Sequence, residues 1–256
     1  MSGLFPRTEV EGLSLSRMII GTNWLAGWSH TSPSADKMIM ERHATKETIV
    51  PMLETYLKYG VDTIMGPFGI TPVIVEAIKE AEDLIKKGRD LGAKISLVHH
   101  SCAEQLVSKR NQTMDGLPDY LAMIRDAGMI PGLSAHMPEL IVYSDLNGYD
   151  VQTYIQIYNC MGFLMQVEVE TVNQIIHSAK KPVMTIKPMA AGRTTPFVGL
   201  NFSWATIRDC DMVTVGCFNE REVEEDIEIS LAALEHRRVN LDKRSSPNTK
   251  QDAFGG

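Results

Sequence analysis

The sequence has little cysteine, and its four cysteines form no closely spaced pair. They are Cys102, Cys160, Cys210 and Cys217. The absence of a Cys-x-x-Cys pair excludes a zinc finger and a thioredoxin-like motif. A chain of 256 residues buries enough apolar surface to fold without a disulfide or a structural metal. We therefore expect four free, inert thiols, buried in a protein of a reducing compartment.

The sequence also lacks a long apolar run and an excess of positive charge. No stretch approaches the roughly 18 apolar residues of a membrane helix, and the N-terminus lacks the apolar run of a signal peptide. The chain has 25 Lys and Arg against 32 Asp and Glu, which leaves no basic stripe for nucleic acid. We therefore expect a cytoplasmic protein that binds a small-molecule substrate and neither nucleic acid nor a membrane. A homo-oligomer is compatible with the sequence.

Three predicted strands in the middle of the chain each end in an imidazole or an amide group. The strand at 94–101 ends in His99 and His100, the strand at 130–136 ends in His136, and the strand at 153–159 ends in Asn159. Helical patterns at 115–126 and from 138 onward separate them. This is a βα repeat, and chemistry in such folds lies at the carboxyl ends of parallel strands.

The remaining chain continues the same alternation. Further strands are predicted at 17–23, 61–65, 182–188 and 211–216, and helices at 45–60, 72–91, 168–179, 201–208 and 220–236. Residues 1–16 predict a short strand or hairpin that plugs the bottom of a barrel. The fold class is therefore an α/β, TIM-type (β/α)8 barrel over residues 1–240, followed by a polar tail at 241–256. Seven strands are clear, so either one strand is hidden between 65 and 94 or the barrel is a seven-stranded variant.

Strand alternation predicts which side chains face the barrel interior. Ser134 and His136 share one face of their strand, opposite the apolar Leu133 and Ala135. The same argument places Gln156 and Tyr158 inward, and puts Thr185 and Lys187 on one face. For the strand at 94–101 the alternation of Ser96 favours His100. Only one of His99 and His100 faces inward unless the strand has already ended.

These positions define a candidate site at the carboxyl ends of the strands. The predicted catalytic residues are Asp62, His99, His100, His136 and Lys187. The predicted substrate-binding residues are Asn23, Trp28, His30, Gln156, Tyr158 and Asn159. A divalent transition metal held by His30, His99, His100 and His136 is a further hypothesis. The alternatives are that each histidine only hydrogen-bonds a loop carbonyl, and that Lys187 is solvated or paired with Asp62 or Glu170.

The long segment 24–37 follows the first predicted barrel strand and carries two tryptophans and His30. Long loops in compact domains are usually functional. We predict that it closes over the strand ends as a lid, with Trp28 and His30 lining the pocket. The alternative is a surface loop whose tryptophans pack on neighbouring helices.

Several segments resemble the aldo/keto reductase family. The segments are 132–148 (GLSAHMPELIVYSDLNG), 182–193 (PVMTIKPMAAGR), 213–231 (VTVGCFNEREVEEDIEISL), 16–22 (SRMIIGT) and 60–63 (GVDT). The resemblance implies a divergent member of that (β/α) barrel superfamily. It also implies that Gly216, Asn219, Glu225 and Asp226 lie near the adenosine if NAD is bound.

The departures from the family pattern concern its catalytic tetrad of Asp, Tyr, Lys and His. Asp62 matches the family's Asp and His99 its His. Pro67 stands where the proton-donating Tyr is expected, with Phe68 beside it, and the strand that carries the Lys is not found. Glu222 occupies the place of the family's basic residue for the 2′-phosphate, and a carboxylate repels phosphate, so NADP is disfavoured.

The sequence leaves four functional hypotheses. The first is an enzyme that acts on a small oxygenated substrate, such as a carbohydrate, by acid–base or metal-assisted chemistry. It would be of lyase, isomerase or hydrolase type rather than an oxidoreductase. The others are an NAD-dependent aldo/keto-type reductase, a Schiff-base lyase acting through Lys187, and a barrel that binds without catalysis.

Overall fold

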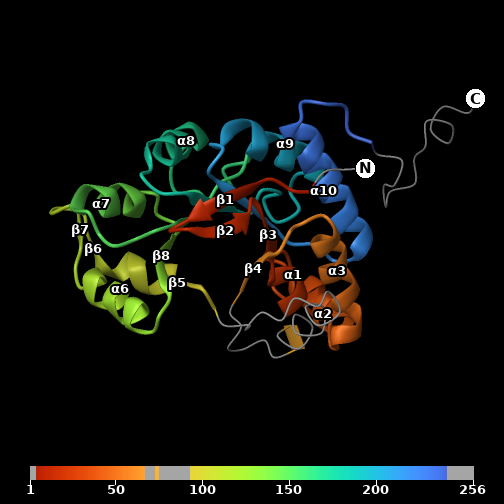
Figure 1. Ribbon diagram of the computed structural model, residues 1–256, viewed down its shortest axis with the longest axis horizontal. Helices are drawn as coiled ribbons and strands as arrows, with labels where there is room; N and C mark the ends of the chain where they lie inside the picture. Colours follow the sequence, from red (N-terminus) through yellow and green to blue (C-terminus); the bar gives the residue numbers. More distant parts are fainter. Residues whose placement is uncertain (1–3, 67–72, 75–92, 241–256) are drawn as a thin grey trace, which may run out of the picture.

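A curled sheet of seven parallel strands forms the centre of the molecule (Figure 1). The computed structural model describes residues 4–66, 73–74 and 93–240. The strands, in the order in which they pair, are β4 (Thr63–Met65), β3 (Met18–Gly21), β11 (Met212–Val215), β10 (Val183–Ile186), β9 (Tyr154–Ile157), β8 (Ile130–Ala135) and β5 (Ile95–Val98). The first barrel strand, β3, therefore pairs with the last, β11, as the closing of a barrel requires.

The two edges of this sheet are β4 and β5, which follow each other in the chain. The strand predicted to be hidden between them, and most of the helix predicted at 72–91, fall at residues 67–72 and 75–92, outside the described residues. The described strands thus confirm the α/β, TIM-like architecture with seven strands. The tail predicted at 241–256 also lies outside the described residues.

Helices cover the outer face of the sheet (Figure 1). They are α1 (Asn23–Ala26), α2 (Pro33–Arg42), α3 (Val50–Lys58), α5 (His100–Ala103), α6 (Leu117–Asp126), α7 (Glu139–Asn147), α8 (Val169–Ser178), α9 (Pro196–Thr206) and α10 (Glu220–Leu234). Two 3₁₀ turns, η1 (Lys46–Thr48) and η3 (Glu104–Leu106), and a small hairpin of β6 (Val107–Ser108) and β7 (Thr113–Met114) complete the connections.

Proline sets where two of these helices begin. Pro51 stands in the first turn of α3, so the helix begins near it rather than at Thr45. Pro196 stands in the first turn of α9, and the Thr195 side chain accepts a hydrogen bond from Val198 N–H. That helix therefore begins about one turn before the predicted start at 201. None of the helices in the described ranges is long and apolar enough to cross a membrane.

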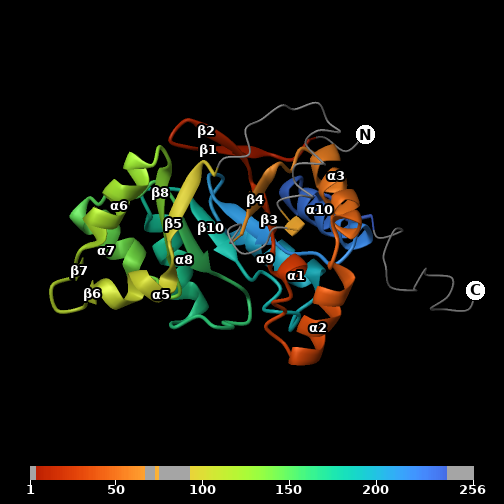
Figure 2. The same ribbon diagram turned by 90° about the horizontal axis from the view of Figure 1, so that it is seen from below.

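The barrel interior is a small apolar cluster closed at one end by an N-terminal hairpin. The hairpin pairs β1 (Arg7–Val10) with β2 (Leu13–Ser16). Its Val10 and Leu15 pack against Ile155, Met184 and Met212, which point inward from the barrel strands. Each such side chain contributes about 1.5–3 kcal/mol when it leaves water. The predicted plug is confirmed, and Figure 2 shows the hairpin at one end of the barrel and α1, α2 and α5 at the other.

Register corrects part of the predicted strand alternation. Ser134 pairs with Ile155, an interior residue, so Ser134 faces inward as predicted. On β9, however, Gln156 pairs with Ala135 and Thr185, and Ala135 packs in the helix layer. Gln156 and Tyr158 therefore face the helices, and the prediction that they point inward is wrong.

Candidate functional site

The carboxyl ends of the strands, which we call the mouth of the barrel, gather three histidine rings. The His100 ring stacks on the His136 ring, with centroids 3.9 Å apart and planes at 26°. The centroid of the His99 ring lies 4.1 Å from that of the His100 ring, and the two ring planes are tilted by 49°. His136 directly follows β8, and the other two follow β5. All three rings therefore lie together at the mouth, whereas the sequence predicted His136 with only one of His99 and His100.

Both His99 and His100 reach the mouth because β5 ends at Val98. His99 has extended backbone and caps α5, where its Nδ1 accepts a hydrogen bond from Ser101 N–H at 3.4 Å. His100 is the first residue of that helix, so its side chain no longer follows strand alternation. Ser96 pairs with Pro131 on the side of the sheet that faces the helices, which makes the expectation that it points inward wrong.

A carboxylate that the sequence argument did not identify completes this group. Glu104 lies four residues after His100, across α5 and η3. Its Oε1 accepts hydrogen bonds from the backbone N–H groups of His136 at 2.6 Å and Met137 at 3.1 Å. One ligand atom from each of His100, Glu104 and His136 lies within 4.8 Å of the others. The i, i+4 spacing of His100 and Glu104 on one helical turn was the signal available in the sequence.

Burial keeps the two stacked imidazoles in the neutral form. Desolvation is the largest cause that lowers the pKa of His136, followed by the charge of His100. Desolvation also lowers the pKa of His100, followed by the charge of His99. The Glu104 carboxylate opposes both effects without reversing them. Neutral imidazole nitrogens are the form that accepts a proton or binds a metal.

Lys187 brings an amine to the same group. Its backbone is left-handed, with φ of 62°, at the first residue after β10 ends at Ile186. A non-glycine residue rarely adopts this conformation. Here it ends the strand alternation that would place the side chains of Lys187 and Thr185 on the same face. Desolvation is the largest cause that lowers the pKa of His30, His100 and His136, and the charge of Lys187 adds to it in each case.

Lys187 is half-buried, and burial lowers its own pKa. Across the described ranges, no salt bridge includes Lys187. The alternative that it pairs with Asp62 is wrong, since Asp62 pairs with Arg7.

The segment predicted as a lid contains α1 and the start of α2. His30 has left-handed backbone, and its Nε2 lies 3.0 Å from Nδ2 of Asn23. Trp24 packs edge-on against Phe218 with ring centroids 6.0 Å apart, as the surface-loop alternative expects, whereas Trp28 is 39 % exposed. The role of the segment as a lid stays a prediction.

Asp62 lies at the opposite end of the barrel. It directly precedes β4, and its Oδ1 accepts a hydrogen bond from Nη1 of Arg7 at 3.0 Å, on the plugging hairpin. The predicted convergence of Asp62 with the histidines is therefore wrong, and β4 ends at the mouth in Met65. Pro67 and Phe68, the predicted replacements of the family's tyrosine, lie outside the described residues.

Two predicted substrate contacts of β9 face other protein groups. The Tyr158 hydroxyl donates to Oγ1 of Thr206 at 3.0 Å and accepts from Nδ2 of Asn173 at 2.8 Å, between α8 and α9. Gln156 is fully buried and donates to the carbonyl of Ile157.

Asn159 is also fully buried and organises the loop after β9. Its Oδ1 accepts from the N–H groups of Met161 and Phe163, and its Nδ2 donates to the Phe163 carbonyl. Asn159 therefore shapes the wall of the mouth through the backbone.

The residues predicted near an adenosine have structural roles in this fold. Asn219 caps α10, and its side chain accepts from Glu222 N–H at 3.0 Å. Trp24 packs so close to Gly216 that a Cβ there would lie 3.3 Å from the Trp24 ring. Glu225 is half-buried on α10 beside Asp226, and its charge raises the pKa of the Asp226 carboxyl.

Asp226 is 3 % exposed and lies under α10. Its Oδ2 accepts from the thiol of Cys217 at 3.3 Å, and that sulfur accepts from the Tyr56 hydroxyl at 3.0 Å. Asp226 is too buried to bind a nucleotide directly.

The cysteines are free thiols, as predicted, but only Cys217 is buried. Cys102 is exposed at the end of α5, and Cys160 and Cys210 are half-buried, so the prediction of four buried thiols is wrong.

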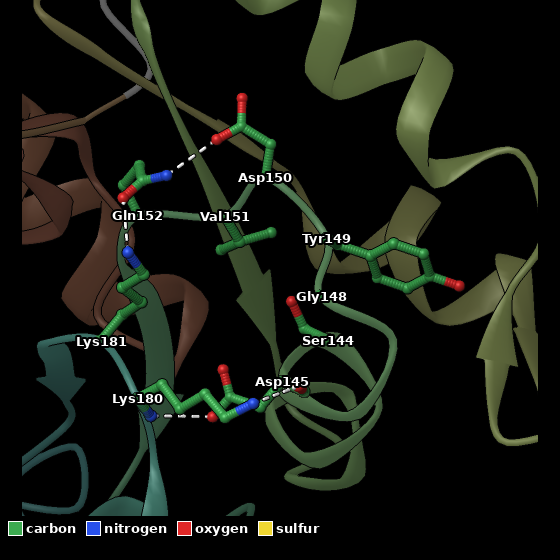
Figure 3. Close-up of a pocket in the computed structure, with 9 residues that line it drawn as sticks. All are labelled: Ser144, Asp145, Gly148, Tyr149, Asp150, Val151, Gln152, Lys180 and Lys181. Atoms are coloured by element: carbon green, nitrogen blue, oxygen red, sulfur yellow. Dashed lines mark hydrogen bonds between the residues drawn. The ribbon is translucent and has the colours of Figure 1, made fainter.

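A pocket of about 350 Å³ lies at the amino ends of β9 and β10 (Figure 3). Its polar groups hydrogen-bond to one another: Lys180 Nζ donates to the backbone carbonyl of Asp145, Lys181 Nζ to Oε1 of Gln152, and Gln152 Nε2 to Oδ1 of Asp150. These groups already have hydrogen-bond partners within the protein, and their bonds hold the loops together. The chemistry of the fold therefore concentrates at the mouth.

Comparison with known proteins identifies the fold. No protein-family model matches the sequence, and no curated protein matches it. Two solved structures from Pseudomonas aeruginosa, each provisionally assigned as an aldo-keto reductase, match the structure at 13 % sequence identity. One covers 91 % of this chain and 97 % of its own with a TM-score of 0.59, and the other covers 90 % and 94 % with a TM-score of 0.56. The chain has the aldo/keto reductase-like (β/α) barrel fold.

Proposed function

We propose that this protein is an enzyme that moves protons on a small oxygenated substrate bound at the mouth of the barrel. The observation that carries the proposal is the gathering of three imidazoles and one amine at the ends of β5, β8 and β10. Groups of this kind exchange protons near neutral pH. Enzymes with this fold class use the same end of the barrel.

The residues have distinguishable roles in this proposal. Nδ1 of His99 accepts the Ser101 N–H, so Nε2 is the ring nitrogen left to donate to the substrate. His100 and His136 are neutral and hold the reacting oxygen of the substrate. Lys187, which directly follows β10 at the same mouth, takes a proton from carbon or returns it. Proton transfer next to a carbonyl is the step shared by isomerases and many lyases.

Hydrogen exchange tests this proposal without a known substrate. The purified protein is incubated in D₂O with a panel of small sugars, hydroxyketones and oxo acids, and proton NMR follows the loss of C–H signals beside the carbonyl. We expect exchange above the buffer rate for at least one compound, and its loss in Lys187→Met and His99→Ala. Exchange that survives both substitutions would refute the assigned roles.

A second candidate is Schiff-base chemistry at Lys187, favoured by the absence of a salt bridge to this amine in the described part of the chain. The neutral amine adds to a carbonyl carbon, water leaves, and an imine forms. Borohydride then delivers hydride to the imine and fixes the adduct. Peptide mapping after treatment with glyceraldehyde and borohydride should find the adduct on Lys187 well before Lys180. Equal labelling of both lysines would exclude this candidate.

The reductase alternative is supported by the fold likeness and by the sequence resemblance described above. NAD(H) that binds the folded chain should raise its melting temperature by mass action. The absence of a shift at millimolar NADH or NADPH would remove this alternative. If exchange, trapping and nucleotide binding all fail, the barrel is a binding protein without catalysis.

A further inference from the structure

We infer that His100, Glu104 and His136 bind one divalent transition-metal ion. Their ligand atoms all lie within 4.8 Å of one another, at the same mouth as the proposed chemistry. The inference deepens the proposed function by naming its cofactor, and its catalytic use rests on that function. This set differs from the one predicted from sequence: it excludes His30 and His99 and includes a carboxylate.

The donor atoms select the class of ion. Two imidazole nitrogens and one carboxylate oxygen suit Zn²⁺, Fe²⁺, Co²⁺ or Mn²⁺, whereas Mg²⁺ and Ca²⁺ prefer oxygen donors alone. With metal–ligand bonds of about 2.1 Å, tetrahedral donor atoms lie roughly 3.4 Å apart. The atoms lie within 4.8 Å of one another, so a pair approaches by up to about 1.4 Å when the ion binds. The stacked His100 and His136 rings must also turn so that a nitrogen of each points at the ion.

Glu104 is oriented for this role before any ion binds. Its Oε1 accepts two backbone N–H groups from the turn after β8, and one of these belongs to His136 itself. The carboxylate thus links the turn after β8 to the helical turn after β5. These two turns supply the imidazoles. No hydrogen bond to its other oxygen is found within the described residues. Outer contacts of this kind orient ligands and strengthen metal sites.

The ligand number implies a catalytic rather than a structural ion. Three protein ligands leave at least one coordination position open, whereas structural zinc sites use four. An ion in this position would polarise a substrate oxygen and make the adjacent carbon more acidic. Lys187 and His99, which the set does not include, remain to exchange the proton.

One local charge opposes the ion. Lys187 directly follows β10 at the same mouth, and its ammonium form would repel a divalent cation. Replacing Lys187 with Met should therefore leave metal affinity unchanged or raise it. This outcome separates a metal site from a histidine cluster that Lys187 helps to support.

Titration calorimetry of the full chain, stripped with chelator, with Zn²⁺ and Co²⁺ tests the inference. We expect one ion per chain and a visible Co²⁺ absorption spectrum. His136→Ala and Glu104→Gln should each weaken binding by more than about 10-fold. The controls His177→Ala, an exposed histidine on α8, and His30→Ala should bind as the wild type does. Circular dichroism shows whether each variant is folded.

Three results would overturn the inference: no Zn²⁺ binding by wild type below about 100 µM, binding by Glu104→Gln or His136→Ala as tight as that of wild type, or weaker binding by His30→Ala. The metal measurement needs no turnover, so its failure is separate from that of the proposed function. Metal binding without hydrogen exchange in any compound would reject only the proposed function.

Discussion

The two ends of this barrel use similar polar residues in opposite ways. At the amino end, Arg125 forms bidentate contacts with Glu11 of the hairpin and with Asp150. At the mouth, three imidazoles and Lys187 gather, and no salt bridge joins Lys187 in the described part of the chain. Paired charges fix the geometry of loops, whereas unpaired polar groups that converge remain available for a ligand. Pairing, more than residue type, therefore separates structural from functional polar groups here.

The strongest of the amino-end pairs is also the most buried. Asp211 is fully buried and accepts two hydrogen bonds from the Arg208 guanidinium and one from Val183 N–H at the start of β10. The same guanidinium donates to the carbonyl of Lys181. A buried carboxylate with this many donors holds two strand starts in register.

The largest predicted effect is at this pair. Asp211→Ala leaves the half-buried Arg208 charge without its buried partner and should lower the free energy of unfolding by about 3–5 kcal/mol. Urea denaturation of the variant measures the loss. An exposed acid of the same chain, Asp209→Ala, is the matched control and should change stability by less than about 0.5 kcal/mol. A loss below about 1 kcal/mol for Asp211→Ala would break the contrast between the two ends.

A second buried carboxyl, that of Asp226, differs from Asp211 because no cation among the described residues pairs with it. Desolvation raises the pKa of Asp226 to about 8, with Cys217 as its hydrogen-bond partner. The folded state therefore holds this proton from the ordinary carboxyl range up to about pH 8. Raising the pH through that interval removes stability, since the unfolded chain releases the proton more readily.

We predict that wild type loses about 2 kcal/mol of stability between pH 6 and pH 8 relative to Asp226→Asn, which cannot ionise. Urea denaturation at a series of pH values measures the difference between the two proteins. Parallel pH profiles for wild type and variant would mean that Asp226 is ionised in the folded protein.

The third prediction concerns Asp62, whose partner Arg7 is partly exposed. Asp62→Asn should cost less than about 1 kcal/mol, because solvent screens such pairs. It should also leave hydrogen exchange and metal affinity unchanged, since Asp62 lies at the amino end. If Asp62→Asn lost hydrogen exchange while its stability stayed normal, Asp62 would have the catalytic role that the resemblance to the family implied.

The smallest effect is expected at the mouth. In metal-free protein, His136→Ala should change the free energy of unfolding by less than about 0.5 kcal/mol, because its backbone N–H still bonds to Glu104. Saturating Zn²⁺ should stabilise wild type and not the variant. A large loss of stability without metal would mean that the ring stack is a structural element.

The sequence predicted the fold because its signals are local and repeated. Strand and helix periods alternate along the chain, and the hairpin at the N-terminus carries apolar residues on one face, as Val10 and Leu15 confirm. The histidines at the ends of β5 and β8 followed from the same pattern. The error on β9 arose because the interior is apolar, while the Tyr158 hydroxyl finds partners between α8 and α9.

The tertiary structure alone decided where the side chains that follow the strand ends are placed. Alternation stops where a strand stops, so the left-handed turn at Lys187 and the helical start at His100 had no counterpart in the pattern. Glu104 joined the site only through backbone N–H groups of a strand 32 residues away. The sequence by itself determined the barrel and brought histidines to its mouth. Contacts between loops, which depend on atoms distant in the chain, decided which side chains meet there.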